Sequence, residues 1–170
     1  MDTSTRDSPV DTNQLLRDNI MTNTIENTAV QSLTKDQVIA KCGSVDTGLV
    51  GTDLDGLQME GIDLSGMEIS YADIRDANLK GANLTDCFFE DTDLTGTDFT
   101  GANLEGAEFV NVIINGAVFT GANLKDVNFG IESFADAVFT DAELKGAFVP
   151  HQLFHSDSFL EAKSEGVEVG

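Results

Sequence analysis

The sequence predicts an all-β solenoid, in which short extended legs and tight corners wind into a four-sided coil with an apolar interior. Three observations predict this fold. Apolar residues recur at every fifth position from residue 54 to residue 144, a small or apolar residue stands two positions before most of them, and Gly, Asp or Asn stands two positions after most of them. A spacing of five fits neither the 3.6-residue period of a helix nor the two-residue period of one long strand.

The series of apolar residues has no gap. All 19 of its positions are apolar although only 41% of the chain is hydrophobic, and this excludes coincidence at a level on the order of 10⁻⁷. The series is Leu54, Met59, Leu64, Ile69, Ile74, Leu79, Leu84, Phe89, Leu94, Phe99, Leu104, Phe109, Ile114, Phe119, Leu124, Phe129, Phe134, Phe139 and Leu144.

Each unit of five contains one leg and one corner. Residues two apart in an extended chain point to the same side, so Leu84 and Ala82 both face inward at the two ends of a three-residue leg. Two residues remain for the corner. The second of them is often Gly, as in Gly81 and Gly101, or Asp or Asn, which tolerate tight turns and positive φ.

The side chains also indicate how many legs complete one turn. At an interval of 20 residues like stacks on like, as in Leu64, Leu84 and Leu104, whereas an interval of 15 mixes Leu, Ile and Phe in nearly every column. Stacked like side chains fill space without voids, so four legs per coil are expected. At ~4.8 Å per coil, residues 52–146 make nearly five coils and a prism ~23 Å tall.

One charged residue falls at an inward position of this pattern. Glu132, in the stretch "IESFA", stands where Ala usually stands two residues before the next apolar position. A buried, unpaired carboxylate is costly, so we expect a local bulge or opening at this point of the coil.

The N-terminal end of the stack should be covered by a short helix within residues 31–46. Thr34 and Gln37 form a capping-box pattern, Leu33 and Val38 form a hydrophobic staple around it, and Gly43 supplies a stop signal. Solenoids need such caps because their end coils otherwise expose the core. Residues 1–30, rich in Thr, Asn, Asp and Ser, are expected to be mostly disordered, although "QLLRDNIM" could form a helix on a partner.

The C-terminal end should be covered by a cap and tail over residues 150–170. Phe154 and Phe159 keep the five-residue phase, and together with Leu160 they are expected to cover the open, Phe-rich end of the core. Ser158 and Glu161 have the spacing of a capping box, which predicts a brief helix there.

The stretches "ANLKGANLTD" and "ANLEGAEF" resemble the pentapeptide-repeat family, whose repeat pattern is A(D/N)LxG. The resemblance covers slightly more than half of the chain. It implies a right-handed quadrilateral parallel β-helix, which here occupies residues 47–149 in about five coils between the two helical caps.

Composition and motifs narrow the function classes. The net charge of −21 disfavours direct binding of nucleic acid, and no apolar run approaches the ~20 residues that span a bilayer. We therefore expect a cytoplasmic protein, or one in an organelle lumen if a targeting peptide has been removed. Cys42 and Cys87 read as buried free thiols, and His151 and His155 lack the further ligands of a metal site.

The pattern also gives no sign of catalysis. A filled prism offers flat walls without the pocket in which catalytic groups converge, and every Gly belongs to a corner of the coil, so none forms a phosphate-binding loop. We expect no enzyme activity, no cofactor and no metal.

A column of carboxylates is the first candidate binding surface. Asp53, Asp73 and Asp93 should stack on one wall with Asp55 and Asp76 beside them and Arg75 as their counterion. Each neighbouring pair of stacked carboxylates repels by about 0.9 kcal/mol even at the dielectric constant of water, and Asn would have served the turns without that cost. This acidic wall could bind a basic partner, or it could serve solubility alone.

An apolar patch is the second candidate. Six apolar residues occupy outward positions that are usually polar, and Val118 and Val138 should stack on one wall. A contiguous group of exposed apolar side chains suggests an interface, whereas scattered ones need no explanation. The patch consists of Phe88, Val110, Ile113, Val118, Ile131 and Val138.

The sequence therefore predicts a non-enzymatic, acidic scaffold that binds a protein partner with a basic or mixed basic and apolar surface, and it leaves a homodimer open. The alternative is a DNA mimic. The repeats carry about one net charge per 1.5 Å, against one per ~1.7 Å of duplex DNA, and the resemblance extends to quinolone-resistance proteins that imitate DNA and bind type II topoisomerases. Its size speaks against this alternative, because the prism spans only ~7 base pairs.

Overall fold

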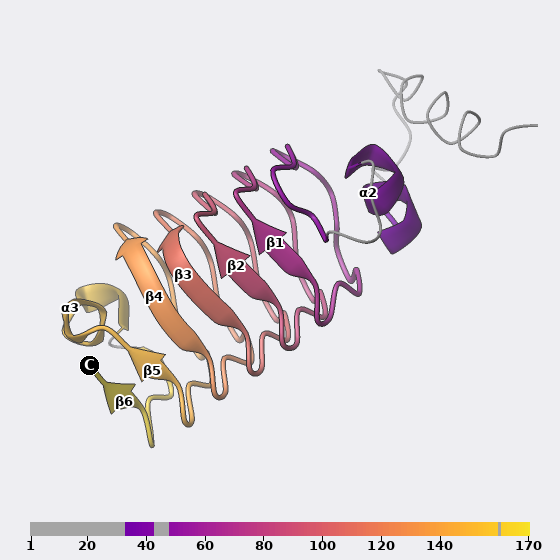
Figure 1. Cartoon of the computed structure of the whole chain (residues 1–170). Coiled ribbons are helices and arrows are strands. Elements are labelled where there is room, and N and C mark those ends of the chain that lie inside the picture. Colours follow the sequence, from indigo (N-terminus) through magenta and orange to yellow (C-terminus); the bar gives the residue numbers. More distant parts are fainter. Residues whose placement is uncertain (1–32, 43–47, 160) are drawn as a thin grey trace, which may run out of the picture.

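The computed structural model describes residues 33–42, 48–159 and 161–170. These residues form one stack of coils whose successive turns lie side by side (Figure 1). In chain order the elements are α2 (Lys35–Cys42), β1 (Glu68–Ser70), β2 (Phe88–Glu90), β3 (Glu108–Ile113), β4 (Asn128–Ser133), β5 (Phe148–Val149), α3 (His151–Phe154), the 3₁₀ helix η1 (Asp157–Phe159) and β6 (Glu168–Val169).

The strands make up one wall of the coil, here called the strand wall. They lie in sequence order from β1 to β6 and pair in parallel, with Glu68 beside Phe88 and Phe88 beside Glu108. Apart from one shifted pair between β3 and β4, partners are 20 residues apart, which confirms four legs per coil.

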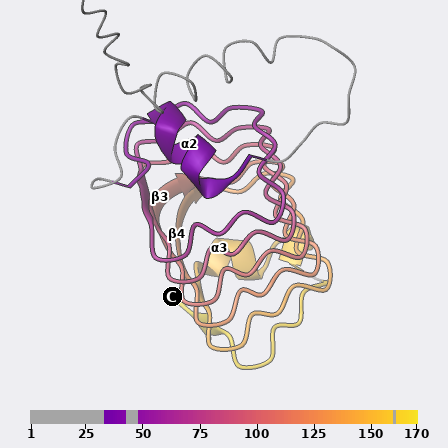
Figure 2. The ribbon, with the colours of Figure 1, turned by 90° about the vertical axis from the view of Figure 1, so that its right-hand side faces the viewer.

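The other three walls are columns of single bridges with the same interval of 20 residues, and Figure 2 shows the outline of the coil with α2 lying across one end. Each wall is named here after its outward residues. They are the aspartate wall (Asp53, Asp73, Asp93, Ile113), the valine wall (Gln58, Asn78, Asp98, Val118, Val138) and the asparagine wall (Asp63, Asn83, Asn103, Asn123, Glu143, Lys163).

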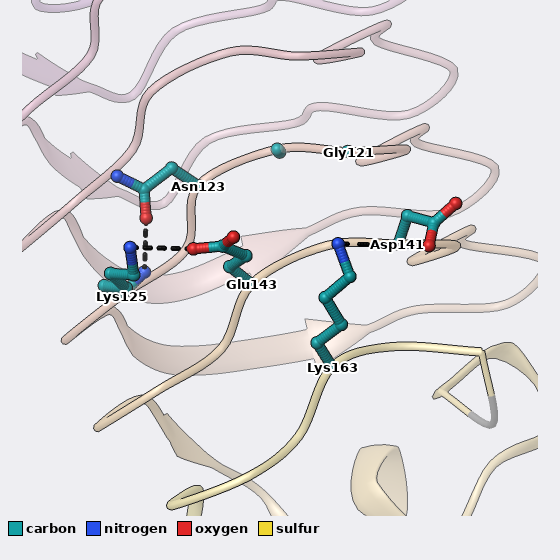
Figure 3. A pocket seen from close by; sticks show the side chains of 7 residues that line it. Gly121, Asn123, Lys125, Asp141, Glu143 and Lys163 are labelled. Atoms are coloured by element: carbon teal, nitrogen blue, oxygen red, sulfur yellow. Dashed lines mark hydrogen bonds and ion pairs between the residues drawn. The ribbon is translucent and has the colours of Figure 1, made fainter.

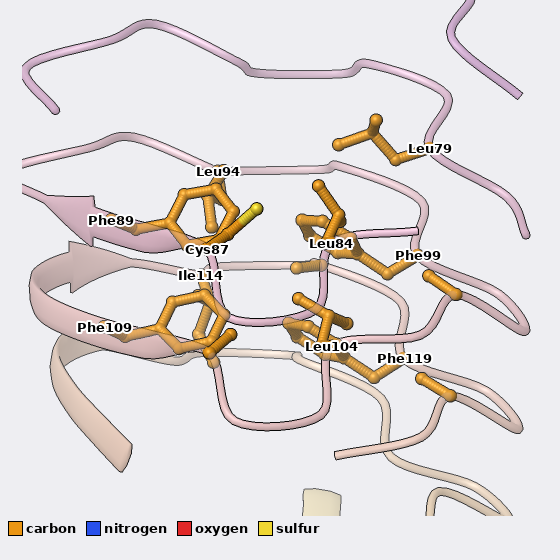
Figure 4. Close-up of a cluster of buried hydrophobic side chains, with 14 of the residues drawn as sticks. Leu79, Leu84, Cys87, Phe89, Leu94, Phe99, Leu104, Phe109, Ile114 and Phe119 are labelled. Atoms are coloured by element: carbon orange, nitrogen blue, oxygen red, sulfur yellow. The ribbon is translucent and has the colours of Figure 1, made fainter. Parts of the chain in front are cut away.

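The apolar series fills the interior. Every member is buried except Phe134, which is half-buried and packs against the others. Like side chains stack across coils, as Leu84 and Leu104 do, and Phe99 and Phe119 lie with their ring centroids 4.9 Å apart (Figure 4). The stacked rings and Leu columns remove these side chains from solvent, so burial of this apolar surface is the main stabilising term.

Left-handed backbone closes the corners. Gly101 has φ 66° and Asp76 has φ 54°, both in the region that Gly adopts freely and that Asp and Asn tolerate. At several corners the two residue types alternate between coils. A Cβ atom on Gly96 would meet the Oδ1 atom of Asp76, so the absence of a side chain on one coil leaves space for the carboxylate of the coil before it.

The expected bulge lies in β4. Val112 pairs with Ile131 and Ile113 pairs with Ser133, so Glu132 is left over and is exposed to solvent. The prediction of a bulge at Glu132 is confirmed. Gly130 permits the distortion, because a Cβ atom there would lie 2.5 Å from the carbonyl oxygen of Phe109.

The N-terminal cap follows the predicted motif. The N–H of Thr34 donates to Oε1 of Gln37 at 2.8 Å, and the N–H of Gln37 donates to Oγ1 of Thr34 at 3.4 Å. Val38 is fully buried in the common core, Leu33 packs against it, and the Leu33 N–H donates to the carbonyl oxygen of Gln58 at 2.8 Å. Gly43 and the stretch "QLLRDNIM" lie outside the described residues.

The C-terminal segment differs from the predicted cap and tail. Instead of a helix starting at Ser158, α3 and η1 replace two legs of a coil, and one residue of each, Leu153 and Phe159, is buried. The chain then returns to the stack, where Lys163 bridges to Glu143 and β6 pairs with β5. The coil geometry therefore resumes after residue 160. Leu160 itself lies outside the described residues.

The thiol of Cys87 is buried and free, as predicted. Its Sγ donates to the carbonyl oxygen of Leu64 at 3.0 Å, and burial raises the pKa of the thiol to about 11. The side chain of Cys42 lies outside the described residues.

Candidate interaction surfaces

The aspartate wall carries three stacked carboxylates. Asp53, Asp73 and Asp93 pair coil to coil, as the sequence predicts. Each of their Oδ1 atoms accepts the backbone N–H two residues later, at 3.1 Å, 3.3 Å and 2.9 Å respectively. These bonds stabilise the corners, so part of the charge on this wall has a structural role.

Arg75 neutralises the centre of the wall. Its Nε and Nη2 donate to the two carboxylate oxygens of Asp73 at 2.7 Å and 2.6 Å, and Nη2 lies 4.0 Å from a carboxylate oxygen of Asp55. This fork lowers the pKa of Asp73 and raises the pKa of Arg75. Asp53 and Asp93 remain as carboxylates on either side of the pair.

Asp76 lies at the next corner, between the aspartate wall and the valine wall, and is exposed. The structure thus places three of the five predicted residues of the acidic wall, Asp53, Asp73 and Asp93, on one wall, and the other two, Asp55 and Asp76, at the corner that follows it.

The apolar residues do not form a single patch. Val118 and Val138 stack on the valine wall as predicted, and Val138 is 37% exposed. Phe88 and Val110 lie on the strand wall in β2 and β3, and Ile113 follows Asp93 in the column of the aspartate wall.

Ile131 requires a correction. The bulge turns it toward the interior, where it pairs with Val112 and packs against the core, so it does not point outward as predicted. The remaining five residues are divided among three walls, and four of those five are only half-exposed.

The corner between the strand wall and the aspartate wall contains an exposed aromatic residue. Tyr71 is 59% exposed and has φ 55°, a conformation unusual for a bulky side chain. Its N–H donates to the carbonyl oxygen of Glu90 at 2.7 Å, and the carboxylates of Glu90, Asp91 and Glu68 raise the pKa of its phenol.

Sequence reasoning missed this corner because Tyr71 belongs to neither of the two groups that it considered, the stacked carboxylates and the outward apolar residues. The interval of 20 residues contains the missing signal, since it places Asp91 in the coil next to Tyr71 at the same corner.

The two adjoining walls and their shared corner form what we call the acidic edge. It comprises the segments 53–56, 67–76, 87–96 and 107–116, which contain nine carboxylates and one base, Arg75. Among the described residues, ion pairs on this edge involve only Arg75 with Asp55 and Asp73. Its carboxylates are Asp53, Asp55, Glu68, Asp73, Asp76, Glu90, Asp91, Asp93 and Glu108.

The asparagine wall has a different charge pattern. A shallow hollow of about 520 Å³ lies over its C-terminal coils (Figure 3). There Nζ of Lys125 lies 2.7 Å from a carboxylate oxygen of Glu143, and Nζ of Lys163 lies 4.0 Å from one of Asp141. The first pair raises the pKa of Lys125 and lowers the pKa of Glu143. Because these four charges pair with one another, the hollow presents little net charge.

No metal centre is found among the residues that the structure describes. The rings of His151 and His155 stack with their centroids 4.2 Å apart, and both are exposed. Within the same residues, no helix has the length and apolar character needed to cross a bilayer.

The family model for pentapeptide repeats matches residues 49–86, 72–111 and 102–130 of the chain. Among solved structures, the chain is 30% identical to a pentapeptide repeat protein from the thylakoid lumen of Arabidopsis thaliana, with a TM-score of 0.57, and the match covers 61% of this chain and 72% of that one. The chain belongs to the pentapeptide-repeat family.

More distant structures share the fold alone. Rfr23 from the cyanobacterium Cyanothece 51142 is 19% identical, with a TM-score of 0.40 and coverage of 74% of this chain and 89% of that one. The plasmid-mediated fluoroquinolone resistance protein QnrB1 is 17% identical, with a TM-score of 0.30 and coverage of 82% and 92%. No curated protein sequence matches the chain.

Proposed function

We propose that the protein is a non-enzymatic scaffold whose acidic edge binds a protein partner with a basic surface. The observation that carries this proposal is the charge of the edge, where nine carboxylates face one base that is already bound to Asp73. Uncompensated charge of one sign on a rigid wall attracts a partner of opposite charge and accelerates its association. The rigid stack supports this role, because it holds the carboxylates in place without a partner.

A protein partner is favoured over topoisomerase inhibition by DNA mimicry because apolar side chains interrupt the charge. Phe88 separates Glu68 from Glu108 on the strand wall, and Ile113 ends the column of aspartates after Asp93. A duplex backbone presents phosphates at regular intervals without apolar groups between them, whereas protein interfaces combine both.

We also propose a compartment for the protein, an organelle lumen. The Arabidopsis relative is a protein of the thylakoid lumen, which supports the second of the two expected locations, an organelle lumen. Fractionation of the source cells with an antibody to the native chain tests this, and recovery in the cytosolic fraction would reject it.

The binding proposal is tested by affinity capture from a lysate of the source organism. The bait is the immobilised wild-type chain, compared with an edge variant, Glu90→Gln with Asp91→Asn, and a control variant, Glu105→Gln with Asp126→Asn. Both variants change the net charge equally, and both exchange one Glu at a first corner position and one Asp with positive φ at a second corner position. The control acids lie on the asparagine-wall side of the coil.

We expect the wild-type and control baits to capture the same protein, which elutes as the salt concentration rises, while the edge variant captures markedly less. Equal capture by all three baits would contradict the proposal. Recovery of a type II topoisomerase by the wild-type bait would instead support the DNA mimic, and light scattering of the isolated chain tests the homodimer.

A further inference from the structure

We propose that the sheet face around Tyr71 and Phe88 is the docking surface of the acidic edge, and that Tyr71 receives an arginine side chain from an extended basic segment of the partner. This inference rests on the proposed function and specifies the chemistry of the partner.

Two aromatic side chains, Tyr71 and Phe88, form the first part of this surface. The 59% exposure of Tyr71 leaves much of its ring free for contact, and Phe88 lies half-exposed in the neighbouring coil, between Glu68 and Glu108. Phe88 and Glu90 are both in β2, and the carbonyl oxygen of Glu90 accepts the N–H of Tyr71. Tyr71 therefore lies directly beside the strand that contains Phe88. Two aromatic side chains in adjacent coils therefore face solvent on the most acidic part of the molecule.

Three carboxylates surround the phenol of Tyr71. Glu68 lies three residues before it in β1, Glu90 pairs with its backbone, and Asp91 occupies the same corner one coil later. Their negative charge raises the pKa of the phenol, with Glu90 the largest contributor. Among the described residues, none of the three takes part in an ion pair.

The combination of aromatic rings and carboxylates favours a cation that can contact both. A guanidinium stacks on an aromatic face while its N–H groups donate to carboxylates in a planar fork, whereas an ammonium offers a compact point charge. We therefore expect arginine to bind better than lysine. An extended segment places alternate side chains about 6.8 Å apart, so a second arginine can reach the carboxylates beyond Phe88.

Charge complementarity also argues against two other occupants of this surface, the N-terminal segment of this chain and a second copy of it. Residues 1–32 of this chain carry five acids and two bases, and a second copy of the chain carries a net charge of −21, so both would be repelled. On the asparagine-wall side, Lys125 and Lys163 already lie close to neighbouring acids.

The test uses a fluorescein-labelled peptide of alternating arginine and serine, and its lysine counterpart, with binding measured by fluorescence anisotropy at about 50 mM salt. Tyr71→Asn removes the ring and retains a residue that tolerates positive φ, while Tyr71→Phe keeps the ring. The edge variant and the control variant described above are measured in parallel. Because Tyr71 is the only Tyr and the chain has no Trp, quenching of intrinsic emission by an unlabelled peptide reports contact at this residue directly.

We expect the arginine peptide to bind more tightly than the lysine peptide and to alter the Tyr71 emission. Tyr71→Asn should weaken binding about threefold, the effect expected of a cation–π contact at an exposed site, while Tyr71→Phe should bind as the wild type does. The edge variant should lose more affinity than the control variant.

Equal affinity of the wild type and Tyr71→Asn, an equal loss in the two charge variants, or no binding of the peptide would overturn the inference. The proposed function stands or falls separately, on whether the edge variant loses the captured protein. If capture depends on the edge but not on Tyr71, the scaffold function holds and this docking mode is wrong.

Discussion

Removing one ring from the centre of the Phe column tests how the fold is held together. Phe119 is fully buried between Phe99 and Phe139, with ring centroids 4.9 Å away on both sides, and it meets Phe129 edge-on at 6.4 Å. Phe→Ala in a core costs about 3–5 kcal/mol, and each aromatic pair contributes about 0.5–1.5 kcal/mol beyond area burial. Three partners place Phe119→Ala near the top of this range, at about 5 kcal/mol.

The assay is urea denaturation followed by far-ultraviolet circular dichroism. A loss of about 5 kcal/mol approaches the total stability of a small domain, so Phe119→Leu is measured as well, with an expected loss of roughly 1 to 3 kcal/mol. Val118→Ala is the control, because Val118 is adjacent in sequence but points outward and should cost less than about 1 kcal/mol. If Phe119→Leu costs no more than Val118→Ala, the assignment of inward and outward positions is wrong.

Three further predictions each concern a single residue. Gly130→Ala should destabilise the protein by about 1–3 kcal/mol because its Cβ would press on the carbonyl of Phe109, and a neutral effect in the same urea assay would refute the close approach. Cys87 should resist thiol reagents at neutral pH in a Cys42→Ser background until the protein unfolds, and its raised pKa should make stability fall as pH rises from about 9 toward about 11, since only the unfolded thiol ionises there. Spectrophotometric titration of the single tyrosine should show a pKa above the ordinary value of about 10 that falls in Glu90→Gln, and an unchanged value would place Glu90 away from the ring.

Most of the fold could be predicted because the apolar residue at every fifth position shows which side chains point into the coil. The column of Leu64, Leu84 and Leu104 is buried and in register, as the interval of 20 residues requires. The bulge at Glu132 was also predictable, because a lone carboxylate at an inward position has no partner there. That Ile131 would take the vacated inward place was not, since this depends on how far the backbone shifts at Gly130.

The C-terminal coil and the candidate site were harder to predict for different reasons. Gln152 and Asp157 occupy Ala positions of the five-residue pattern and Ser164 occupies an apolar one, so the sequence alone does not show that β6 returns to the sheet. Tyr71 occupies a corner position at which the repeat usually has Gly, Asp or Asn, and its surroundings arise from three separate segments. Long-range register, rather than local propensity, brings Glu68, Glu90 and Asp91 together around it.

Carboxylate footprinting of the complex with the captured partner tests the central claim most directly. Exposed acids are coupled to an amine with and without the partner, and each site is quantified by mass spectrometry. We expect Glu68, Glu90 and Asp91 to be protected by the partner, while Glu105 and Asp126 react equally in both samples. Protection of Glu105 and Asp126 with unchanged labelling at Glu90 and Asp91 would contradict the claim that the acidic edge is the binding surface.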